Sequence, residues 1–146
     1  MEKLSDLVKS TAMYKMLKLD AYTHPTVRGE WHWGPAGAGK SYGVRQKYPG
    51  AFNKPSSKWW DGYQGEKYVI IDDLDSDCLS HYLKIWADSY ACSGEAKGYT
   101  IPLQHEKLIV TSNYSIERLF ANKGPELIDA LTRRFEIFEY PLKDDI

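Results

Sequence analysis

Short apolar runs alternate with segments of helical spacing along the chain, and this alternation predicts an α/β domain. Four apolar stretches have the length and composition of strands, and they cover residues 28–33, 68–71, 108–111 and 135–140. In the first stretch, Trp31 and Trp33 fall on one face and His32 falls on the other. The two middle stretches are apolar throughout, as in strands that are covered on both faces. We therefore expect a central, mainly parallel sheet.

Helices are expected between these strands. Between residues 79 and 90, apolar positions recur at i, i+3, i+4 and i+7, which predicts an amphipathic helix. The full set of predicted helices covers residues 4–19, 40–47, 79–90, 115–121 and 125–132.

Polar clusters follow three of the predicted strands, at residues 34–41, 72–73 and 112–113. The carboxyl ends of parallel strands meet at one edge of a sheet, and ligands of such sheets bind there. We therefore expect these three clusters to converge on a single site.

Composition and charge narrow the possible functions. The chain has 146 residues, enough for one domain, and a formal net charge of -1, so no overall basic field attracts nucleic acid. Any contact with DNA or RNA must then come from a local patch or a pore. No apolar run reaches the length of a membrane span, and the N-terminus lacks the pattern of a secretory signal. Cys78 and Cys92 are expected to be reduced thiols in the core, and the histidines lack the spacing of metal ligands.

Residues 34–41 read GPAGAGKS and fit the pattern of a phosphate-binding loop between a strand and a helix. The glycines let the backbone turn tightly and point its N–H groups at phosphate oxygens, and the start of the next helix adds its positive end. Lys40 then places a charge on the β- and γ-phosphates, while the Ser41 hydroxyl is suited to bind Mg²⁺. The alternative is an accidental glycine-rich turn. The predicted nucleotide-binding residues are Gly34, Pro35, Ala36, Gly37, Ala38, Gly39, Lys40 and Ser41.

Two acidic residues and an amide complete the predicted site. Asp72 and Asp73 end a buried strand, where we assign Asp72 to Mg²⁺ and Asp73 to polarising the attacking water. Asn113 follows the third strand, and its amide is suited to hydrogen-bond a γ-phosphate oxygen and the water. The alternatives are an aspartate pair that only caps a turn, and a helix N-cap region formed with Ser115.

Basic residues near the end of the chain and in a predicted hairpin are further candidates. Arg133 and Arg134 follow a predicted helix and are candidates for an arginine finger that reaches a neighbouring subunit; a solvated surface pair is the alternative. Residues 94–102 favour a hairpin that turns near Lys97, which with Tyr99 is a candidate contact for nucleic acid. An exposed hairpin tip favours lysine in any case. The irregular segment 53–66 contains two adjacent tryptophans, to which we assign no role.

Six segments together resemble the helicase domain of the replication-associated (Rep) proteins of small circular single-stranded DNA viruses. These proteins belong to the superfamily-3 helicases of the AAA+ class, and circovirus Rep proteins are the most similar of them. The segments are WHWGPAGAGKS at 31–41, KWWDGYQGE at 58–66, VIIDDLD at 69–75, EAKGYTIPL at 95–103, LIVTSN at 108–113 and ALTRRF at 130–135. The phosphate-binding loop is generic by itself, whereas the ordered set is specific.

The resemblance implies a P-loop NTPase core over residues 27–146, preceded by a small helical oligomerisation segment over 1–26. It further implies a ring, most often a hexamer, with ATP and Mg²⁺ bound between subunits. Such a ring moves on single-stranded DNA during rolling-circle replication in the host nucleus. Lys40, Asp73, Asn113 and either Arg133 or Arg134 take the catalytic roles in this comparison, and Lys97 the hairpin role. The family's nicking endonuclease domain has no counterpart here, so we expect it to be covalently linked in a longer protein.

Other functions remain open at this point. A small-molecule P-loop kinase needs an arginine-rich lid that the sequence does not show. A nucleotide-gated assembly or nucleic-acid-binding module with little turnover, and a viral helicase that acts on RNA, fit the same residues.

Overall fold

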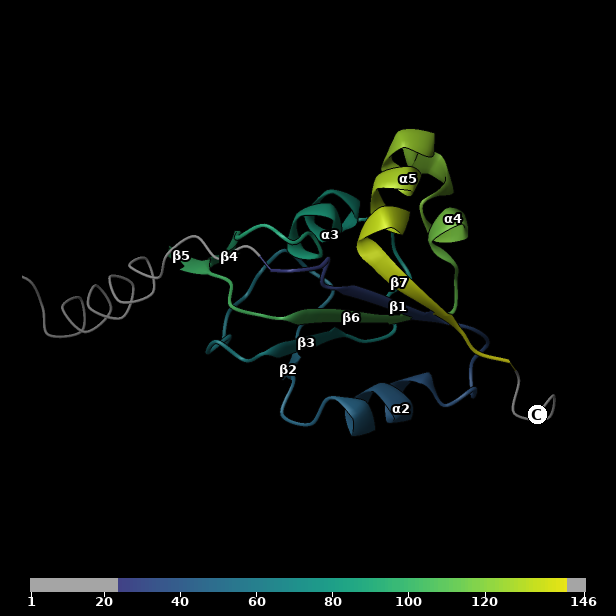
Figure 1. The fold of residues 1–146 in the computed structure, drawn as a ribbon, viewed down its shortest axis with the longest axis horizontal. Coiled ribbons are helices and arrows are strands. Elements are labelled where there is room, and N and C mark those ends of the chain that lie inside the picture. Colours follow the sequence, from purple (N-terminus) through teal and green to yellow (C-terminus); the bar gives the residue numbers. More distant parts are fainter. Residues whose placement is uncertain (1–23, 142–146) are drawn as a thin grey trace, which may run out of the picture.

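Five parallel strands form the centre of the structure, a computed structural model that describes residues 24–141 (Figure 1). The strands are β1 (Gly29–Trp33), β2 (Phe52–Asn53), β3 (Tyr68–Ile71), β6 (Lys107–Ser112) and β7 (Phe135–Glu139), in the order β2-β3-β6-β1-β7. Every neighbouring pair is parallel. The α/β class and the four predicted strands are confirmed, and the short strand β2 lies where no regular structure was predicted. The helix predicted over 4–19, and most of the segment 1–26, lie outside the described residues.

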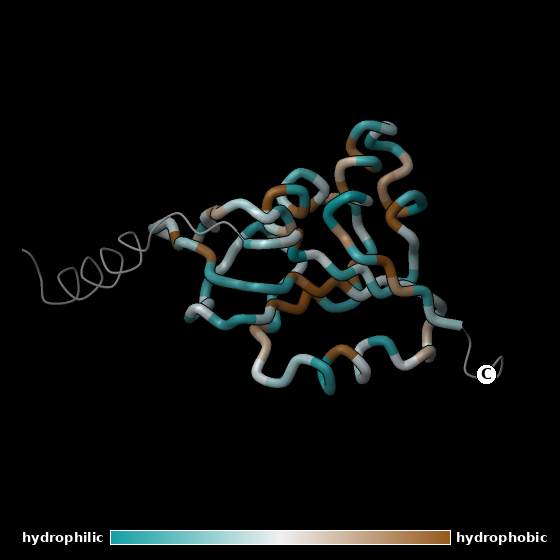
Figure 2. Tube along the Cα trace, in the orientation of Figure 1, coloured by the Kyte–Doolittle hydropathy of each residue, from teal (hydrophilic) through white to brown (hydrophobic). Residues whose placement is uncertain are grey.

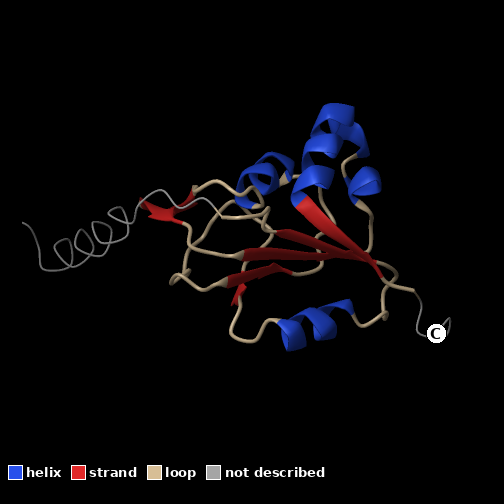
Figure 3. Cartoon of the chain, viewed as in Figure 1, coloured by secondary structure: helices blue, strands red, loops and turns tan. Residues whose placement is uncertain are grey.

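Helices cover both faces of this sheet, but unequally (Figure 3). Of the helices within residues 24–141, α2 (Lys40–Lys47) packs alone on one face, while α3 (Ser80–Trp86), α4 (Ile116–Leu119) and α5 (Pro125–Arg134) gather on the other, with a 3₁₀ turn at Ala121–Lys123. Ser115 caps α4 by accepting a hydrogen bond from the Arg118 N–H at 3.2 Å, and Pro125 starts α5. Among these described helices, none is long and apolar enough to cross a membrane.

Side-chain alternation along the strands separates two apolar cores. On β3, Val69 and Ile71 point into the large core beneath α3 and α5, whereas Ile70 points into a smaller core beneath α2. The central strands are accordingly the most hydrophobic part of the chain trace (Figure 2). Trp31 of β1 is fully buried in the large core, as its predicted position on one strand face implies. Full burial of one such side chain stabilises the fold by about 1.5–3 kcal/mol.

The segment 53–66, which contains the adjacent tryptophans Trp59 and Trp60 and is called the tryptophan segment below, contributes to the large core. Trp60 is fully buried and makes edge-to-face contacts with Trp86 and Tyr63, with ring centroids 5.1 Å and 5.2 Å apart. Lys54, only 3% exposed, places its ammonium over the Trp60 and Trp86 rings and donates hydrogen bonds to the Trp59 and Pro55 carbonyls. Burial lowers the pKa of Lys54 to about 8. The segment is therefore a fixed part of the fold.

The strands β4 (Ser93–Ala96) and β5 (Tyr99–Pro102) form an antiparallel hairpin (Figure 1). The hairpin lies toward the amino ends of the sheet strands, whereas α2 begins at their carboxyl ends. Its turn falls at Lys97-Gly98, as predicted. The backbone N–H of Trp60 donates to the Glu95 carbonyl at 2.9 Å, and the Trp60 ring leaves no room for a side chain at Gly94. The tryptophan segment thus fastens the base of the hairpin to the core.

The helix predicted over 79–90 ends early, at Trp86, whose carbonyl accepts a hydrogen bond from His105 Nε2 at 2.7 Å where a longer helix would pair it with the Tyr90 N–H. Arg28 is 1% exposed, and its guanidinium, together with the Arg28 and His24 backbone N–H groups, donates to the carbonyls of the segment that follows. These four successive carbonyls belong to Ala87, Asp88, Ser89 and Tyr90. A tertiary contact therefore overrides the local helical pattern.

Two further predictions need correction. Cys78 is exposed, so it is not a core thiol, while Cys92 is half-buried and accepts a hydrogen bond from Arg28 at 3.3 Å. Arg133 and Arg134 were expected to follow a helix, but they are the last two residues of α5.

Candidate active site

The loop 34–39 joins β1 to α2 at the carboxyl edge of the sheet. Gly34 is required there because a Cβ atom would lie 2.5 Å from the Tyr140 carbonyl oxygen. Gly37 has a φ of +82° with open space where a side chain would stand, and Gly39 has a φ of +87° immediately before α2. The first turn of α2 has neither a side-chain cap nor an acidic residue. Its N–H groups, which lack intrahelical partners, therefore suit an anion.

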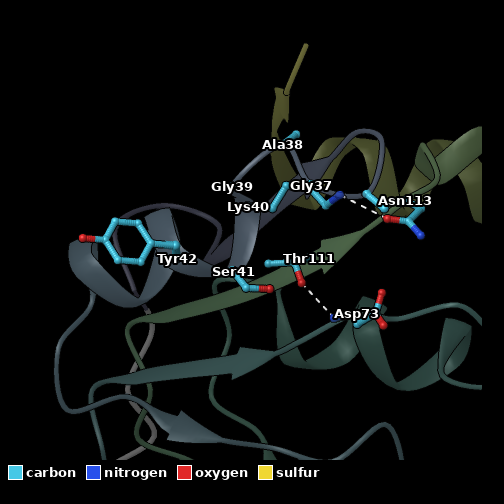
Figure 4. Close-up of a pocket in the computed structure, with 10 residues that line it drawn as sticks. Gly37, Ala38, Gly39, Lys40, Ser41, Tyr42, Asp73, Thr111 and Asn113 are labelled. Carbon is cyan, nitrogen blue, oxygen red and sulfur yellow. Dashed lines mark hydrogen bonds between the residues drawn. The ribbon is translucent and has the colours of Figure 1, made fainter. Parts of the chain in front are cut away.

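Lys40 lies folded against this loop. Its Nζ donates to the Gly34 carbonyl at 2.6 Å, the Pro35 carbonyl at 2.9 Å and the Asn113 side-chain oxygen at 3.1 Å (Figure 4). Burial lowers the pKa of Lys40, against the opposing effect of the nearby carboxylates. The structure thus joins Lys40 and Asn113, which are far apart in the sequence, in one contact.

Asp72 accepts three side-chain hydrogen bonds. The Ser41 and Thr111 hydroxyls both donate to its Oδ1 at 2.6 Å, and Arg45 lies 3.2 Å from its Oδ2. Burial by itself raises the pKa of Asp72. The hydrogen bonds and the Arg45 charge outweigh burial and hold this pKa below its ordinary value. Ser41 and Asp72, the two predicted metal ligands, are therefore adjacent and offer hard oxygen atoms.

Two oxygen ligands suit Mg²⁺, which also binds substrate phosphates and water. They do not suit a metal ion that needs three or more protein side chains. Across residues 24–141, no group of three or more His, Cys, Asp or Glu side chains is placed to hold a metal ion. Mg²⁺ commonly binds through one or two carboxylates together with substrate phosphates and water. Ser41 and Asp72 would hold the ion at this site, and it would supply charge neutralisation for the phosphates.

Asp73 and Thr111 complete the wall of the pocket. The Asp73 N–H donates to the Thr111 hydroxyl oxygen at 2.8 Å, and Asp73 has a φ of +56°, which few non-glycine residues adopt. The pocket has a volume of about 360 Å³. It is lined by the residues drawn in Figure 4: Ala36, Gly37, Ala38, Gly39, Lys40, Ser41, Tyr42, Asp73, Thr111 and Asn113.

Sequence reasoning missed Thr111, Arg45 and Tyr42 at this site. Thr111 carries a recognisable signal, since it is a hydroxyl residue at the end of an otherwise apolar strand. The Arg45 contact depends on the way α2 packs over β3, which the sequence pattern does not specify.

The remaining candidates lie at the other end of the strands. Phe135 pairs with Gly29 at the start of β1, so the preceding Arg134 is a full strand length away from the loop that follows Trp33. Arg134 binds Asp88 at 3.1 Å, whereas Arg133 is 71% exposed and pairs only with Asp129 of its own helix among the described residues.

The hairpin candidates differ in exposure. Lys97 is exposed, and its backbone N–H donates to the Asp61 carboxylate at 3.1 Å. Tyr99 is half-buried and packs against the core. The phosphate-binding loop, Asp72, Asp73 and Asn113 therefore converge as predicted, whereas the arginines and the hairpin do not join them within one chain.

Fold and site together define a P-loop NTPase core, in which the loop between β1 and α2 faces carboxylates from β3 and an amide from β6. A family model described as RNA helicase matches residues 30–114, more than half of the chain.

Viral replication-associated proteins are similar in sequence. That of porcine circovirus 1 is 33% identical over 110 residues, which are 73% of this chain and 35% of that protein. That of porcine circovirus 2 is 34% identical over 104 residues, 69% of this chain and 33% of that protein. The chain thus spans about a third of the length of these curated relatives. The structure of a putative primosome component from Streptococcus pyogenes serotype M3 matches 96% of this chain and 81% of that one, with 14% sequence identity and a TM-score of 0.47. A likeness this weak adds nothing to the assignment.

The chain belongs to the RNA helicase family, as a helicase domain of the kind found in circovirus replication-associated proteins.

Proposed function

We propose that this chain is an ATP-hydrolysing motor domain that assembles into a ring and moves on single-stranded DNA during viral rolling-circle replication. One observation carries the proposal: Lys40, Ser41, Asp73 and Asn113 come from three separate segments and line one pocket, and Asp72 accepts a hydrogen bond from the Ser41 hydroxyl beside it. Such a set serves phosphoryl transfer to water and is not needed for nucleotide binding alone.

Each side chain has a part in this reaction. Lys40 exchanges its loop carbonyls for the β- and γ-phosphates, and the N–H groups of the loop and of α2's first turn bind phosphate oxygens. Asp73, whose carboxylate faces the pocket, orients and polarises the attacking water (Figure 4). Asn113, released from Lys40, hydrogen-bonds the γ-phosphate or the water. Bound Mg²⁺ would neutralise the charge that develops on the phosphates.

The distant arginines support a shared active site. They lie at the strand ends opposite the pocket, so they serve a nucleotide only from a neighbouring subunit. Of the two, Arg133 fits the finger role better. It is exposed and held by one surface ion pair, whereas Arg134 binds Asp88 and the Ala130 carbonyl within its own subunit. Exposed surface pairs are weak, so Arg133 can leave Asp129 at little cost.

The hairpin is the proposed contact for single-stranded nucleic acid. Lys97 projects at its tip, and the tryptophan segment anchors its base rigidly to the core. A ring of such lysines supplies the local basic surface that the net charge of the chain does not. RNA is the second candidate ligand, because the matching family model is described as RNA helicase.

ATP hydrolysis by the full chain, measured with and without single-stranded DNA or RNA, tests the proposal. We expect stimulation by DNA, no binding of ATP by Lys40→Ala, and binding without turnover by Asp73→Asn. Among the described residues, the hydrogen bond of Asp73 is made by its backbone N–H and not by its carboxylate. Asp73→Asn should therefore leave the fold intact, so a loss of turnover in this variant would report on the reaction itself. Greater stimulation by RNA would support an RNA helicase. ATP binding without turnover in the wild type would instead indicate a nucleotide-gated assembly module.

A further inference from the structure

Tyr42 is an exposed aromatic residue at the edge of the nucleotide pocket. It is the third residue of α2, its ring is 73% exposed, and it lines the pocket beside Ser41. Within residues 24–141 its side chain has no hydrogen bond, ring contact or cation contact. The ring therefore contributes little to the stability of the described fold, and its position calls for another explanation.

The pocket has two chemically different ends. Lys40, Asp73 and Asn113 form the end that suits the γ-phosphate and the attacking water. Tyr42 lies on the far side of Ser41 from Asn113, and its ring extends outward over the first turn of α2 (Figure 4). A triphosphate with its terminal group at Lys40 runs along the loop N–H groups toward this turn. The nucleoside then leaves the pocket beside the tyrosine ring.

We propose that Tyr42 stacks on the base of the bound nucleotide and that base binding at this site depends on stacking rather than on hydrogen bonds. This inference rests on the proposed nucleotide-binding function. Stacking on an aromatic face tolerates every base, because each base has a π-face, and it favours larger ring systems. The lining residues on the loop side, Ala36 and Ala38, carry methyl groups that cannot read the polar edge of a base. The site therefore accepts several nucleoside triphosphates and binds purines more tightly than pyrimidines.

Calorimetric titration of the full chain with three Mg²⁺-complexed ligands tests this inference: ATP, CTP and inorganic tripolyphosphate. We expect Tyr42→Ala to weaken ATP binding about tenfold and CTP binding less, while tripolyphosphate binding stays unchanged. Tyr42→Phe keeps the ring and should bind as the wild type does. Tyr90→Ala is the matched control, since Tyr90 is a similarly exposed tyrosine, 66% exposed, away from the pocket.

Two results would overturn the inference and leave the proposed function standing. One is ATP affinity that is unchanged in Tyr42→Ala; the other is an equal loss of ATP and tripolyphosphate affinity, which would make Tyr42 a support of the loop. Light scattering on the same samples checks assembly. A loss of ATP affinity found only where assembly is also lost would make Tyr42 an interface residue and likewise overturn it. A wild-type chain that binds neither ATP nor tripolyphosphate would refute the proposed function itself.

Discussion

A buried carboxylate beneath α2 should make the stability of this domain depend on acidity. Glu30 of β1 is almost fully buried, and it accepts hydrogen bonds from the Tyr48 hydroxyl and from His32 Nε2 at 2.9 Å. The Tyr140 hydroxyl in turn forms a hydrogen bond with His32 Nδ1, at 2.7 Å. This network joins α2 to β1 and to the chain segment that packs against Gly34.

The magnitude follows from the pKa of Glu30. Burial raises it, but the hydrogen bonds from His32 and Tyr48 and the charge of Lys47 outweigh burial and lower the pKa from 4.5 to about 2. A lowered folded-state pKa stabilises the fold above the unfolded-state value, and this stabilisation is lost as the pH falls toward the folded-state value. The full effect is about 3 kcal/mol, of which about 2 kcal/mol disappears between about pH 6 and about pH 3.

Urea unfolding of the wild type and of Glu30→Gln across this pH range measures the effect. Glutamine keeps the shape but carries no charge, so the stability difference between the two proteins should shrink by about 2 kcal/mol as the pH falls. Glu136→Gln is the control, because Glu136 pairs with Glu30 across the strands but is exposed. Parallel pH profiles for the wild type and Glu30→Gln would refute the reasoning.

Two further predictions concern the far end of the sheet and the hairpin. Arg133→Ala should leave the melting temperature unchanged and lower DNA-stimulated hydrolysis at least tenfold. Arg134→Ala should lower the free energy of unfolding by about 1 kcal/mol, because it loses the ion pair with Asp88. Equal activity in Arg133→Ala and the wild type would rule out the finger role. Gly94→Ala places a methyl group 2.4 Å from the Trp60 ring, so it should destabilise the domain by about 1–3 kcal/mol in chemical unfolding, and a change under 0.5 kcal/mol would contradict the packing described.

The elements and residues that the sequence identified depend on local pattern. Residues 34–41 carry their signal in consecutive positions, and the apolar runs of β3 and β6 are bounded by polar residues. Parallel pairing then brings Asp72 and Asn113 to the same edge, because the strands run in one direction. Local pattern and one topological rule therefore predict most of the pocket.

The features that the sequence left unassigned depend on long-range contacts. Lys54 and Arg28 look like ordinary surface cations, yet both are buried, where they bind carbonyls and, for Lys54, aromatic faces. Neither has a sequence neighbour that announces this role. Trp60 was unassignable for the same reason, because its partners Phe52, Trp86 and His105 lie in three other segments.

The separation of the two ends of the sheet bears most directly on mechanism. The pocket lies beyond the carboxyl ends of the strands, and both Arg133 and the hairpin lie toward their amino ends. Rotamer changes within one chain cannot bridge the length of β1, whose five residues span about 17 Å. If hydrolysis needs an arginine, a neighbouring subunit must supply it, and hydrolysis per chain must fall on dilution as the assembly dissociates. Hydrolysis per chain that stays constant while light scattering shows the mass falling to that of a single chain would show that each chain carries a complete active site.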